Sequence, residues 1–407
     1  MLFHKLGLLL CLLYTMTDAA AVGDGAKDVT AGEARFASKL YGVLSKARTA
    51  DNLIVSPASI RAALAMAYLG AEGSTELELQ RGLELPVGNK SQVAQQFAEL
   101  LSAAKAEVAA EDEEEQPKLK YANRIYVTDK YALAEKFQQL ASKYFGAAAE
   151  SVSFEQSTET AQRINAWVEQ QTNGLIKELV SSSGLNAQTA AMLINAIYFK
   201  ADWRNNFEDY ATSPREFLQR QGERITVDTM YQSDYFNYAQ LPALNATAVE
   251  LPYRGTDIVF MIILPQQQQG LAALESKLEQ MDLHAISSQL RRQKVELSLP
   301  KFKFEFDVSL QQTLEQLGLK ELFSTQANFG SMLQAAAPLH ISEVKHKAYI
   351  ELNEKGTSAA GATFVKVSLE SYIENEVSYE FKVDHPFFFA IKNSEHIYFM
   401  GHVNQLS

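Results

Sequence analysis

Cysteine is nearly absent from this sequence of 407 residues, and the single one, Cys11, lies in an apolar segment at the N-terminus. Without that segment the chain has no thiol, which excludes disulfides, cysteine nucleophiles and cysteine metal ligands. Small secreted domains depend on disulfides because they cannot bury a large core. This chain is long and 47% hydrophobic, so it has the material for a sizeable core instead.

Clustered positive charge and long apolar runs are missing as well. Lysine and arginine number 37 against 49 aspartate and glutamate residues, which gives a formal net charge of −12. Nucleic acids and anionic membranes bind clustered basic residues, so neither is expected as a partner. Beyond the N-terminus, no uncharged apolar run reaches the length of about 18 residues that a membrane-spanning helix needs.

Catalytic motifs are absent too. The sequence contains no Gly-x-Ser-x-Gly, no Gly-x-x-x-x-Gly-Lys-Ser/Thr, no His-Glu-x-x-His and no Gly-x-Gly-x-x-Gly. The histidines of the C-terminal part have no convincing metal-ligand spacing with an acidic residue, and histidines in strands are mostly structural: His340, His346, His385, His396 and His402. An enzyme would need a site built from scattered residues. We therefore expect no enzymatic activity, no metal ion and no cofactor.

The N-terminus has the composition of a secretory signal. A weakly positive start, with His4 and Lys5, precedes an apolar run at residues 6–14, and small residues follow. Cleavage is expected after Ala19, Ala20 or Ala21. Residues 1–20 are thus predicted to be a signal peptide and residues 21–407 a single domain. A membrane anchor is the alternative, but the run is too short to span a bilayer.

Two asparagines fit the same compartment. Asn89 stands in Asn-Lys-Ser and Asn245 in Asn-Ala-Thr, which are acceptor patterns for N-glycosylation. Both patterns are short and arise by chance. They support, without proving, a secreted and extracellular glycoprotein.

The hydrophobic periodicity predicts helices first and strands later. Helices are predicted at residues 34–44, 58–69, 92–110, 160–180 and 271–290. Ser56 and Pro57 are typical of an N-cap and a first turn before the second of these helices, and Gly70 and Gly73 are expected to end it. Strands are predicted at residues 119–127, 192–199, 248–251, 258–264, 295–299, 301–308, 340–352, 379–383, 387–391 and 397–403. Without regular βαβ alternation, this order predicts an α+β fold built on large sheets.

Four segments resemble the serpin family and occur in that family's order. Asn-Leu-Ile-Val-Ser-Pro-Ala-Ser-Ile at residues 52–60 is similar to its early strand-to-helix segment. Asn-Ala-Ile-Tyr-Phe-Lys-Ala-Asp-Trp at residues 195–203 is similar to its central-sheet strand. Asn-Glu-Lys-Gly-Thr-Ser-Ala-Ala-Gly-Ala-Thr at residues 353–363 resembles the hinge of its inhibitory members, and residues 381–391 resemble its C-terminal signature. The resemblance covers nearly all of the mature chain.

The resemblance implies a fold and a function. The fold is a serpin fold with three β-sheets, eight or nine helices and an exposed reactive-centre loop at about residues 354–379. The function is inhibition of a serine-type endopeptidase as a suicide substrate. The protease attacks the loop and forms an acyl-enzyme, and the cut loop inserts as a new strand in the central sheet and distorts the protease. The alternative is a non-inhibitory member that serves as a carrier, storage or binding protein.

The hinge can be examined on physical grounds as well. By resemblance it comprises Glu354, Gly356, Thr357, Ser358, Ala359, Ala360, Gly361, Ala362 and Thr363. A segment that becomes a middle strand enters between neighbours about 4.8 Å away on each side, so its first side chains must be small. Residues 357–363 contain nothing larger than threonine. A flexible linker would also have this composition.

The residues after the hinge argue against a linker because they alternate. Thr363, Val365, Val367 and Leu369 share one face, with polar residues and Phe364 on the other. Burial of the aliphatic residues and new backbone hydrogen bonds stabilise the inserted strand. The conformational entropy lost when a free chain is ordered nearly offsets this gain in free energy. The driving force must therefore include strain in the uncleaved molecule.

The resemblance also implies a set of residues that control insertion. Ser56, Asn195 and His346 match a hydrogen-bonded latch beneath the strands that open. Glu354 matches a residue that pairs with Lys301. Trp203 matches the position where the loop first enters. Ordinary structural packing is the alternative for all of them.

The scissile bond stays open. Counting forward from Glu354 in the family's spacing predicts Glu370–Ser371 as the reactive bond, whereas counting back from Pro386 predicts Asn375–Glu376. We prefer the forward count because the mechanism constrains the length of the inserted strand. Two other residues suit common proteases: Lys366 a trypsin-like and Tyr372 a chymotrypsin-like enzyme.

The expected partner is an extracellular serine protease of the trypsin or chymotrypsin type. Activation by a glycosaminoglycan is not expected, because the acidic run at residues 111–115 opposes a polyanion. We expect a monomer.

Overall fold

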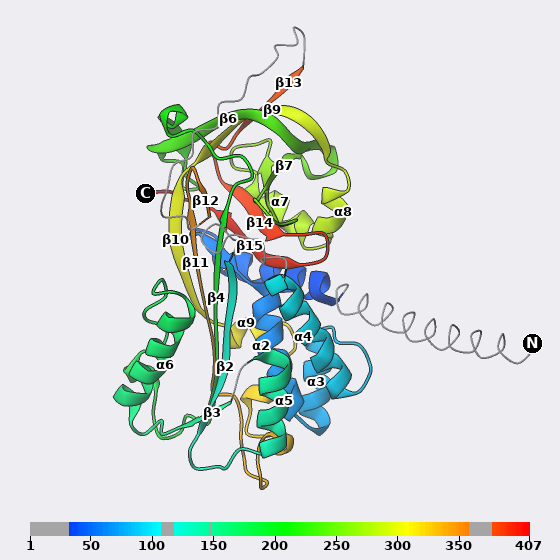
Figure 1. Cartoon of the computed structure of the whole chain (residues 1–407), viewed down its shortest axis with the longest axis vertical. Helices are drawn as coiled ribbons and strands as arrows, with labels where there is room; N and C mark the ends of the chain where they lie inside the picture. The colour runs from blue at the N-terminus through cyan, green and yellow to red at the C-terminus, as the bar shows by residue number, and fades with distance from the viewer. Residues whose placement is uncertain (1–31, 107–117, 147–148, 358–376) are drawn as a thin grey trace, which may run out of the picture.

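The computed structural model describes residues 32–106, 118–146, 149–357 and 377–407, and the side chains of residues 103–106 lie outside that description. A six-stranded sheet runs along the length of the molecule (Figure 1). Its strands, in spatial order, are β10 (Phe302–Ser309), β11 (Glu343–Leu352), β12 (Gly356–Thr357), β4 (Ala191–Asp202), β2 (Lys118–Thr128) and β3 (Glu150–Val152).

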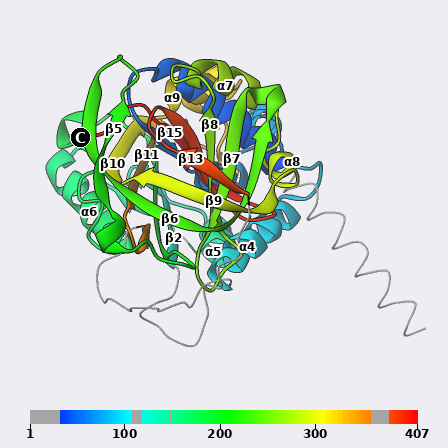
Figure 2. The same ribbon diagram turned by 90° about the horizontal axis from the view of Figure 1, so that it is seen from above.

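The second sheet has nine strands. Along its path they are β1 (Leu53–Val55), β15 (Ile397–Val403), β14 (Phe387–Lys392), β8 (Val259–Pro265), β7 (Ala246–Pro252), β6 (Arg224–Leu241), β9 (Arg291–Pro300) and β13 (Ser378–Lys382), with β5 (Ser213–Leu218) on β6. The long strand β6 joins two parts: it pairs with β5 and β9 over most of its length and with β7 at its end. The described strands thus form two hydrogen-bonded sheets where three were expected, because β6 joins the part with β5, β9 and β13 to the part with β7, β8, β14, β15 and β1. Figure 2 shows β6 and β9 crossing the top of the molecule.

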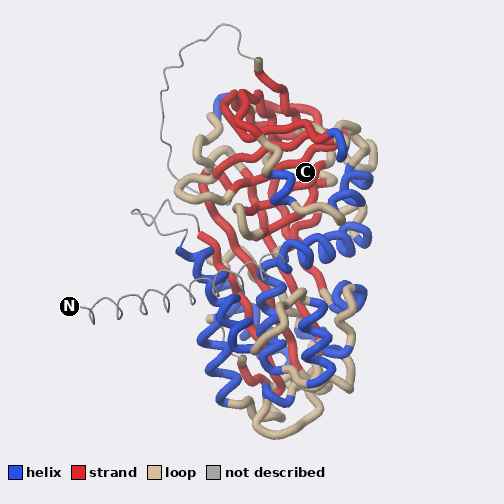
Figure 3. Tube along the Cα trace, turned by 90° about the vertical axis from the view of Figure 1, so that its right-hand side faces the viewer, coloured by secondary structure: helices blue, strands red, loops and turns tan. Residues whose placement is uncertain are grey.

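Nine α-helices lie within the described residues. They are residues 32–47, α2 (Pro57–Gly70), α3 (Gly73–Gly82), α4 (Lys90–Ala106), α5 (Glu135–Phe145), α6 (Ser157–Gln171), α7 (Leu271–Leu278), α8 (Leu283–Ser287) and α9 (Gln311–Gln316). Five 3₁₀ turns lie in the connections between elements of the described residues: η1 (Ser182–Gly184), η2 (Asp209–Ala211), η3 (Pro242–Leu244), η4 (Glu321–Phe323) and η5 (Gly330–Met332). Helix α6 covers one face of the long sheet, and α2, α4 and α5 cover the other (Figure 1). Most helices gather at one end of the molecule (Figure 3).

Several local predictions are confirmed. Ser56 caps α2, since its hydroxyl oxygen accepts a hydrogen bond from the Ser59 backbone N–H at 3.3 Å, and Pro57 occupies the first turn. The continuous apolar run predicted at residues 192–199 is β4, buried in the middle of the long sheet between β2 and β11. The strand predicted at residues 301–308 is β10, whose alternating residues leave one face exposed to solvent.

Other boundaries were wrong. The helix predicted at residues 160–180 ends at Gln171, because Asn173 and Gly174 adopt positive φ angles of 53° and 79° and turn the chain. The helix predicted at residues 271–290 is two short helices, α7 and α8, separated at residues 279–282. The strand predicted from residue 340 begins at Glu343. The end of the predicted helix at residues 107–110 lies outside the described residues.

The long sheet separates two apolar cores. The larger one lies between the two sheets and beneath α2 and α5. The smaller one lies under α6, where Ile164 and Val168 of the helix pack toward Met192 and Ile194 of β4. Both faces of the middle of the long sheet are therefore covered, which explains why β4 is apolar throughout. Within the described residues, no helix combines the length and apolar character that crossing a membrane requires.

Candidate functional site at the seam between β4 and β11

The central feature of the long sheet is a seam between two parallel strands, β4 and β11. They pair directly from Met192 and Glu343 to Ile197 and Ala348. Beyond Ala348 the strands separate, and β12 lies between them, antiparallel to both. The same two strands are thus neighbours at one end and hold a third strand at the other. In the lower part of the seam β4 and β11 are hydrogen-bonded to each other, whereas at its upper end β12 separates them.

A tight turn returns the chain from β11 into the seam. The Asn353 backbone N–H donates to the Gly356 carbonyl at 2.9 Å, and Asn353 Oδ1 accepts from the Lys355 backbone N–H at 3.0 Å. Gly356 then passes very close to β4. A Cβ atom at this position would lie 2.0 Å from the carbonyl oxygen of Ala201, so only glycine fits without moving backbone.

An ion pair holds the turn at the mouth of the seam. The Glu354 carboxylate lies 3.0 Å from Lys301 Nζ and accepts a hydrogen bond of 2.8 Å from the Thr212 hydroxyl. Burial alone would raise the pKa of Glu354, but a backbone hydrogen bond, Lys301 and Thr212 outweigh it, and its pKa lies below the ordinary value. The pairing of Glu354 with Lys301 was implied by the resemblance, and the structure has this ion pair.

Aromatic side chains form the floor beneath β12. Trp203 stacks on Tyr253 with ring centroids 4.7 Å apart, and its indole N–H donates to the Asn353 carbonyl at 2.9 Å. The Tyr253 and Thr357 hydroxyl oxygens are 2.5 Å apart, and both side chains are buried. Burial raises the pKa of Tyr253, so its hydroxyl stays protonated and able to donate. This floor fixes the first residues of β12 by both packing and hydrogen bonding.

A buried hydrogen-bonded cluster closes the seam lower down. His346 of β11 and Asn195 of β4 are register partners across it, with Nδ1 and Oδ1 2.5 Å apart. The Ser56 backbone N–H donates to His346 Nε2 at 3.4 Å, so the hydrogen belongs on Nδ1 and is donated to Asn195. Asn195 Nδ2 donates to Ser59 Oγ at 2.6 Å and to Asn123 Oδ1. Neutral His346 thus fastens β11 to β4.

Helix α6 and the chain after it cover the front of the seam. Lys347 of β11 donates to the Glu178 carbonyl at 2.9 Å and pairs with Glu305 of β10 at 2.8 Å. Asn165 of α6 accepts hydrogen bonds from the Leu179 and Val180 backbone N–H groups at 3.0 and 2.9 Å. A strand added lower in the seam therefore requires this cover to shift.

The structure brings together most of the predicted residues that it describes. Lys301 and Glu354 form one contact, Trp203 lies beneath the turn, and Ser56, Asn195 and His346 share one cluster. Asn89 and Asn245 are exposed. The remaining hinge and scissile-bond residues lie outside the described residues: Ser358, Ala359, Ala360, Gly361, Ala362, Thr363, Lys366, Glu370, Ser371, Tyr372 and Asn375.

Four contributors to this site were not predicted. Thr212 and Tyr253 contact Glu354 and Thr357, and Ser59 and Asn123 complete the Asn195 cluster. Ser59 could have been found, because it lies three residues after the predicted N-cap Ser56 and therefore on the same face of α2. The others depend on strand register, for which the sequence has no local signal.

The buried His346 predicts a loss of stability in acid. Burial lowers the pKa of His346 to about 3, whereas unfolded histidine titrates near 6.5. The unfolded chain therefore binds the extra proton between these values, and stability from neutral His346 is present above about pH 6.5 and lost as the pH falls toward 3. From pH 7 to pH 5, we expect the free energy of unfolding to fall by about 2 kcal/mol through this residue. Urea unfolding at both values measures the change.

The matched control separates His346 from other titrating groups. His346→Gln removes the buried imidazole and should reduce the difference between pH 7 and pH 5 by about 2 kcal/mol. His340→Gln, in the loop before β11, should keep the full difference. An equal acid response in His346→Gln and the unchanged protein would show that His346 is not the group responsible.

Known proteins share this sequence and architecture. A family model described as serpin (serine protease inhibitor) matches residues 31–406. Serine protease inhibitor 42Dd of Drosophila melanogaster is 37% identical over 375 residues, which cover 92% of this chain and 97% of that protein. The crystal structure of Serpin48 from the insect Tenebrio molitor has a TM-score of 0.83 at 34% identity and covers 94% of this chain and 99% of that one.

A protein named for a different role has the same architecture. A thyroxine-binding globulin in complex with thyroxine has a TM-score of 0.81 at 25% identity and covers 93% of this chain and 99% of that one. The architecture alone therefore does not separate inhibitors from binding proteins. The family model and the close relatives agree on the family itself, and this chain belongs to the serpins, a family of serine protease inhibitors.

Proposed function

We propose that this protein inhibits an extracellular serine protease of the trypsin or chymotrypsin type as a suicide substrate. The observation that carries the proposal is β12, which already lies between β4 and β11 at the upper end of the seam. Residues 358–376 connect β12 to β13, so a cut within them frees one end of the chain to follow β12 into the sheet. The small residues after Thr357 suit that path.

The chemistry begins on the protease. Its serine oxygen attacks the carbonyl carbon of the reactive bond and forms an ester with the N-terminal part of this chain. The peptide bond breaks, and the serine proton passes through the protease's histidine to the new amino group. The protease is then attached to the strand that enters the seam. Insertion carries it to the far end of the sheet before water hydrolyses the ester.

The register of β12 predicts where the inserted residues fall. Thr357 pairs with Ala201 of β4 and Leu352 of β11. Continuing both registers downward pairs residue 363 with Asn195 on one side and His346 on the other. Insertion must therefore break the contact between these two side chains, and Thr363 is small enough to replace it. The latch is thus a barrier within the path of the loop.

The same register constrains the reactive bond. Strand β11 begins at Glu343 and β4 at Ala191, so they offer partners down to residues 366 and 367 of the loop. A cut after Lys366 would leave no chain between the inserted strand and the attached protease. Cuts after Glu370, Tyr372 or Asn375 leave three or more residues as a connection. The register therefore disfavours Lys366 and is compatible with Glu370–Ser371, the bond that the forward count from Glu354 favours.

The direct test is adduct formation. Incubation with trypsin, chymotrypsin and a glutamate-specific serine protease should yield, with one of them, an adduct that survives SDS. Mass spectrometry of the released C-terminal fragment then identifies the bond, and we expect the fragment to begin at Ser371. Proteolysis by all three enzymes without any adduct would contradict the inhibitory mechanism.

The proposal includes secretion and glycosylation. It is supported by the apolar N-terminal segment and by the exposure of Asn89 and Asn245. The mature protein is expected to begin near residue 21 and to lose mass on treatment with an amidase that removes N-linked glycans. An intact N-terminus on protein retained inside cells would refute the secretory assignment.

A further inference from the structure

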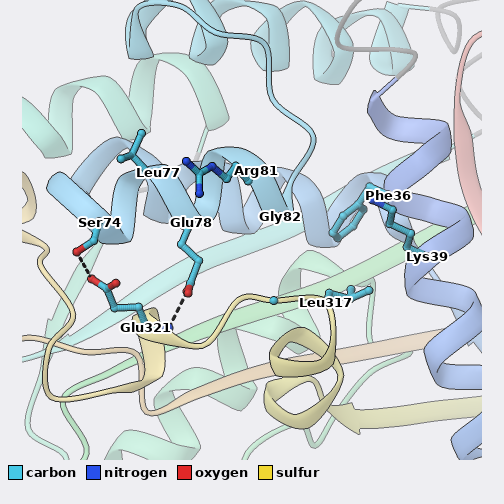
Figure 4. Close-up of a pocket in the computed structure, with 10 residues that line it drawn as sticks. Phe36, Lys39, Ser74, Leu77, Glu78, Arg81, Gly82, Leu317 and Glu321 are labelled. Atoms are coloured by element: carbon cyan, nitrogen blue, oxygen red, sulfur yellow. Dashed lines mark hydrogen bonds between the residues drawn. The ribbon is translucent and has the colours of Figure 1, made fainter.

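A pocket away from the seam has the features of a ligand site. It opens between the helix at residues 32–47, α3 and the segment that follows α9, and its cavity volume is about 450 Å³ (Figure 4). None of the residues that line it belongs to β4, β11 or β12. The volume lies within the usual range for sites that bind small molecules. Neither the proposed inhibition nor the seam uses this pocket.

One end of the pocket is acidic. Glu321 Oε1 accepts hydrogen bonds from the Ser74 hydroxyl at 2.7 Å and the Thr75 hydroxyl at 2.6 Å. Glu78 Oε1 accepts the Glu321 backbone N–H at 2.6 Å. These bonds hold both carboxylates in place, and Figure 4 shows those of Ser74 and Glu78 with Glu321. In the part of the chain that the structure describes, the second oxygen of each carboxylate has no hydrogen bond and can accept one from a cation.

The other side of the pocket is basic. Lys39 of the first helix pairs with Glu84 at 2.5 Å, which leaves its ammonium group two further hydrogens to donate. Arg81 of α3 is exposed, and its guanidinium has no ion pair or hydrogen bond within the described residues. Together with Glu78 and Glu321, the lining carries two positive and two negative side chains. A net-neutral ligand with separated charges matches this arrangement better than a simple anion or cation.

Apolar side chains line the space between the charges. Phe36, Leu77 and Leu317 all border the pocket. Leu77 is 50% exposed and is one of five large apolar side chains that are exposed in the described residues. A ligand with an apolar middle would cover it and remove that surface from water.

The helix sets the distance between the charges. Ser74, whose hydroxyl binds Glu321, and Arg81 are seven residues apart on α3, which is about 10 Å along the axis at 1.5 Å per residue. Glu78 is only three residues from Arg81, but its carboxylate reaches the backbone N–H of Glu321 at that acidic end. We propose that the pocket binds a small zwitterion whose primary amine and carboxylate are joined by a short apolar spacer. The amine contacts Glu78 and Glu321, and the carboxylate contacts Arg81 and Lys39. A free ω-amino acid and a peptide that ends in lysine both have this chemistry.

The test uses 6-aminohexanoate as the probe. Leucine methyl groups of the full mature chain are labelled with ¹³C, and their NMR signals are followed during titration. The signals of Leu77 and Leu317, assigned through Leu77→Ile and Leu317→Ile, should shift and saturate. Hexanoate and hexylamine, which carry one charge each, should bind at least about tenfold more weakly, because each leaves one pair of charged groups without a partner.

Two variants remove one charge each while keeping the shape. Arg81→Gln and Glu78→Gln should each weaken binding of 6-aminohexanoate by about fivefold or more, with unchanged melting temperature. Lys177→Gln, an exposed cation after α6 on the other side of the long sheet, is the matched control and should bind like the unchanged protein.

Each outcome decides something. Gly-Gly-Lys binding more tightly than 6-aminohexanoate, with loss of binding when its carboxylate is amidated, identifies a peptide end as the ligand; the reverse order identifies a free amino acid. The proposal is overturned if the Leu77 and Leu317 signals do not move, if either singly charged probe binds as well as the zwitterion, or if Arg81→Gln has no effect.

Discussion

Cleavage of the chain between residues 358 and 376 is expected to raise the melting temperature by more than about 10 °C. For a domain of this size the entropy of unfolding is roughly 0.8 kcal/mol per degree, so this rise corresponds to a gain of about 8 kcal/mol. The gain comes from the seam. A strand inserted from Thr357 downward replaces one ladder, between β4 and β11, by two ladders, and each added backbone hydrogen bond contributes about 1 kcal/mol net.

The direction of this change is diagnostic. A cut in the loop of an ordinary protein adds chain freedom and lowers stability or leaves it unchanged. Only a protein whose uncut form is held away from its most stable arrangement gains from being cut. The measurement is calorimetry before and after limited proteolysis, with mass spectrometry showing a single cut within the segment. A protein cut at residues 107–117 instead is the control and should not melt higher.

A local readout accompanies the thermal one. Insertion would separate Asn195 from His346, so the His346 ring signals should shift in an NMR spectrum of the cut protein. The amides of β4 and β11 beyond Ile197 and Ala348, where the two strands diverge, should also exchange more slowly with solvent, because the inserted strand would pair with both strands there. A cut protein that melts no higher and keeps its His346 signals would support the alternative, a carrier or binding protein with a static loop.

The sequence predicted the seam only in part. The apolar run of β4 and the alternation of β10 identified these strands directly. A strand buried on both faces is apolar throughout, and a strand buried on one face alternates between apolar and polar residues. Strand β6 escaped detection, since polar residues at Gln232, Ser233 and Asp234 interrupt its alternation where it passes from one part of its sheet to the other. Helices α3 and α5 were also missed. Gly73, taken as the end of the preceding helix, is the first residue of α3.

The functional residues divide in the same way. Ser56, Asn195 and His346 were identified by resemblance, but their contact depends on the parallel register of β4 and β11, which no local pattern encodes. Tyr253 lies in none of the motifs and reaches Thr357 only because Trp203 pairs with it across an isolated bridge. The contacts that assemble the site therefore depend on strand pairing, which the sequence does not reveal locally.

If the protein is the inhibitor proposed above, replacement of Thr357 by arginine is expected to convert it into a substrate. Thr357 is 1% exposed, lies between β4 and β11, and its hydroxyl contacts Tyr253 over the aromatic floor. A guanidinium there would be buried among aromatic rings without a carboxylate partner. The free-energy cost of burying this unpaired charge far exceeds the stabilisation that threonine provides at the same position. The side chain will therefore stay outside, and the residues after it cannot enter the seam. The protease still cuts the loop, but hydrolysis then outpaces insertion.

The measurement for this variant compares adduct with cleaved product at equal protease. We expect the yield of SDS-stable adduct to fall by at least about tenfold, while cleavage continues and the cut variant shows no rise in melting temperature. Thr357→Ser keeps a small hydroxyl and should remain an inhibitor. Val377→Arg places the same charge at the other end of the segment, where the side chain is 72% exposed, and should also inhibit. If Thr357→Arg formed the adduct as efficiently as Val377→Arg, insertion would not start at β12, and the seam would lose its role in the mechanism.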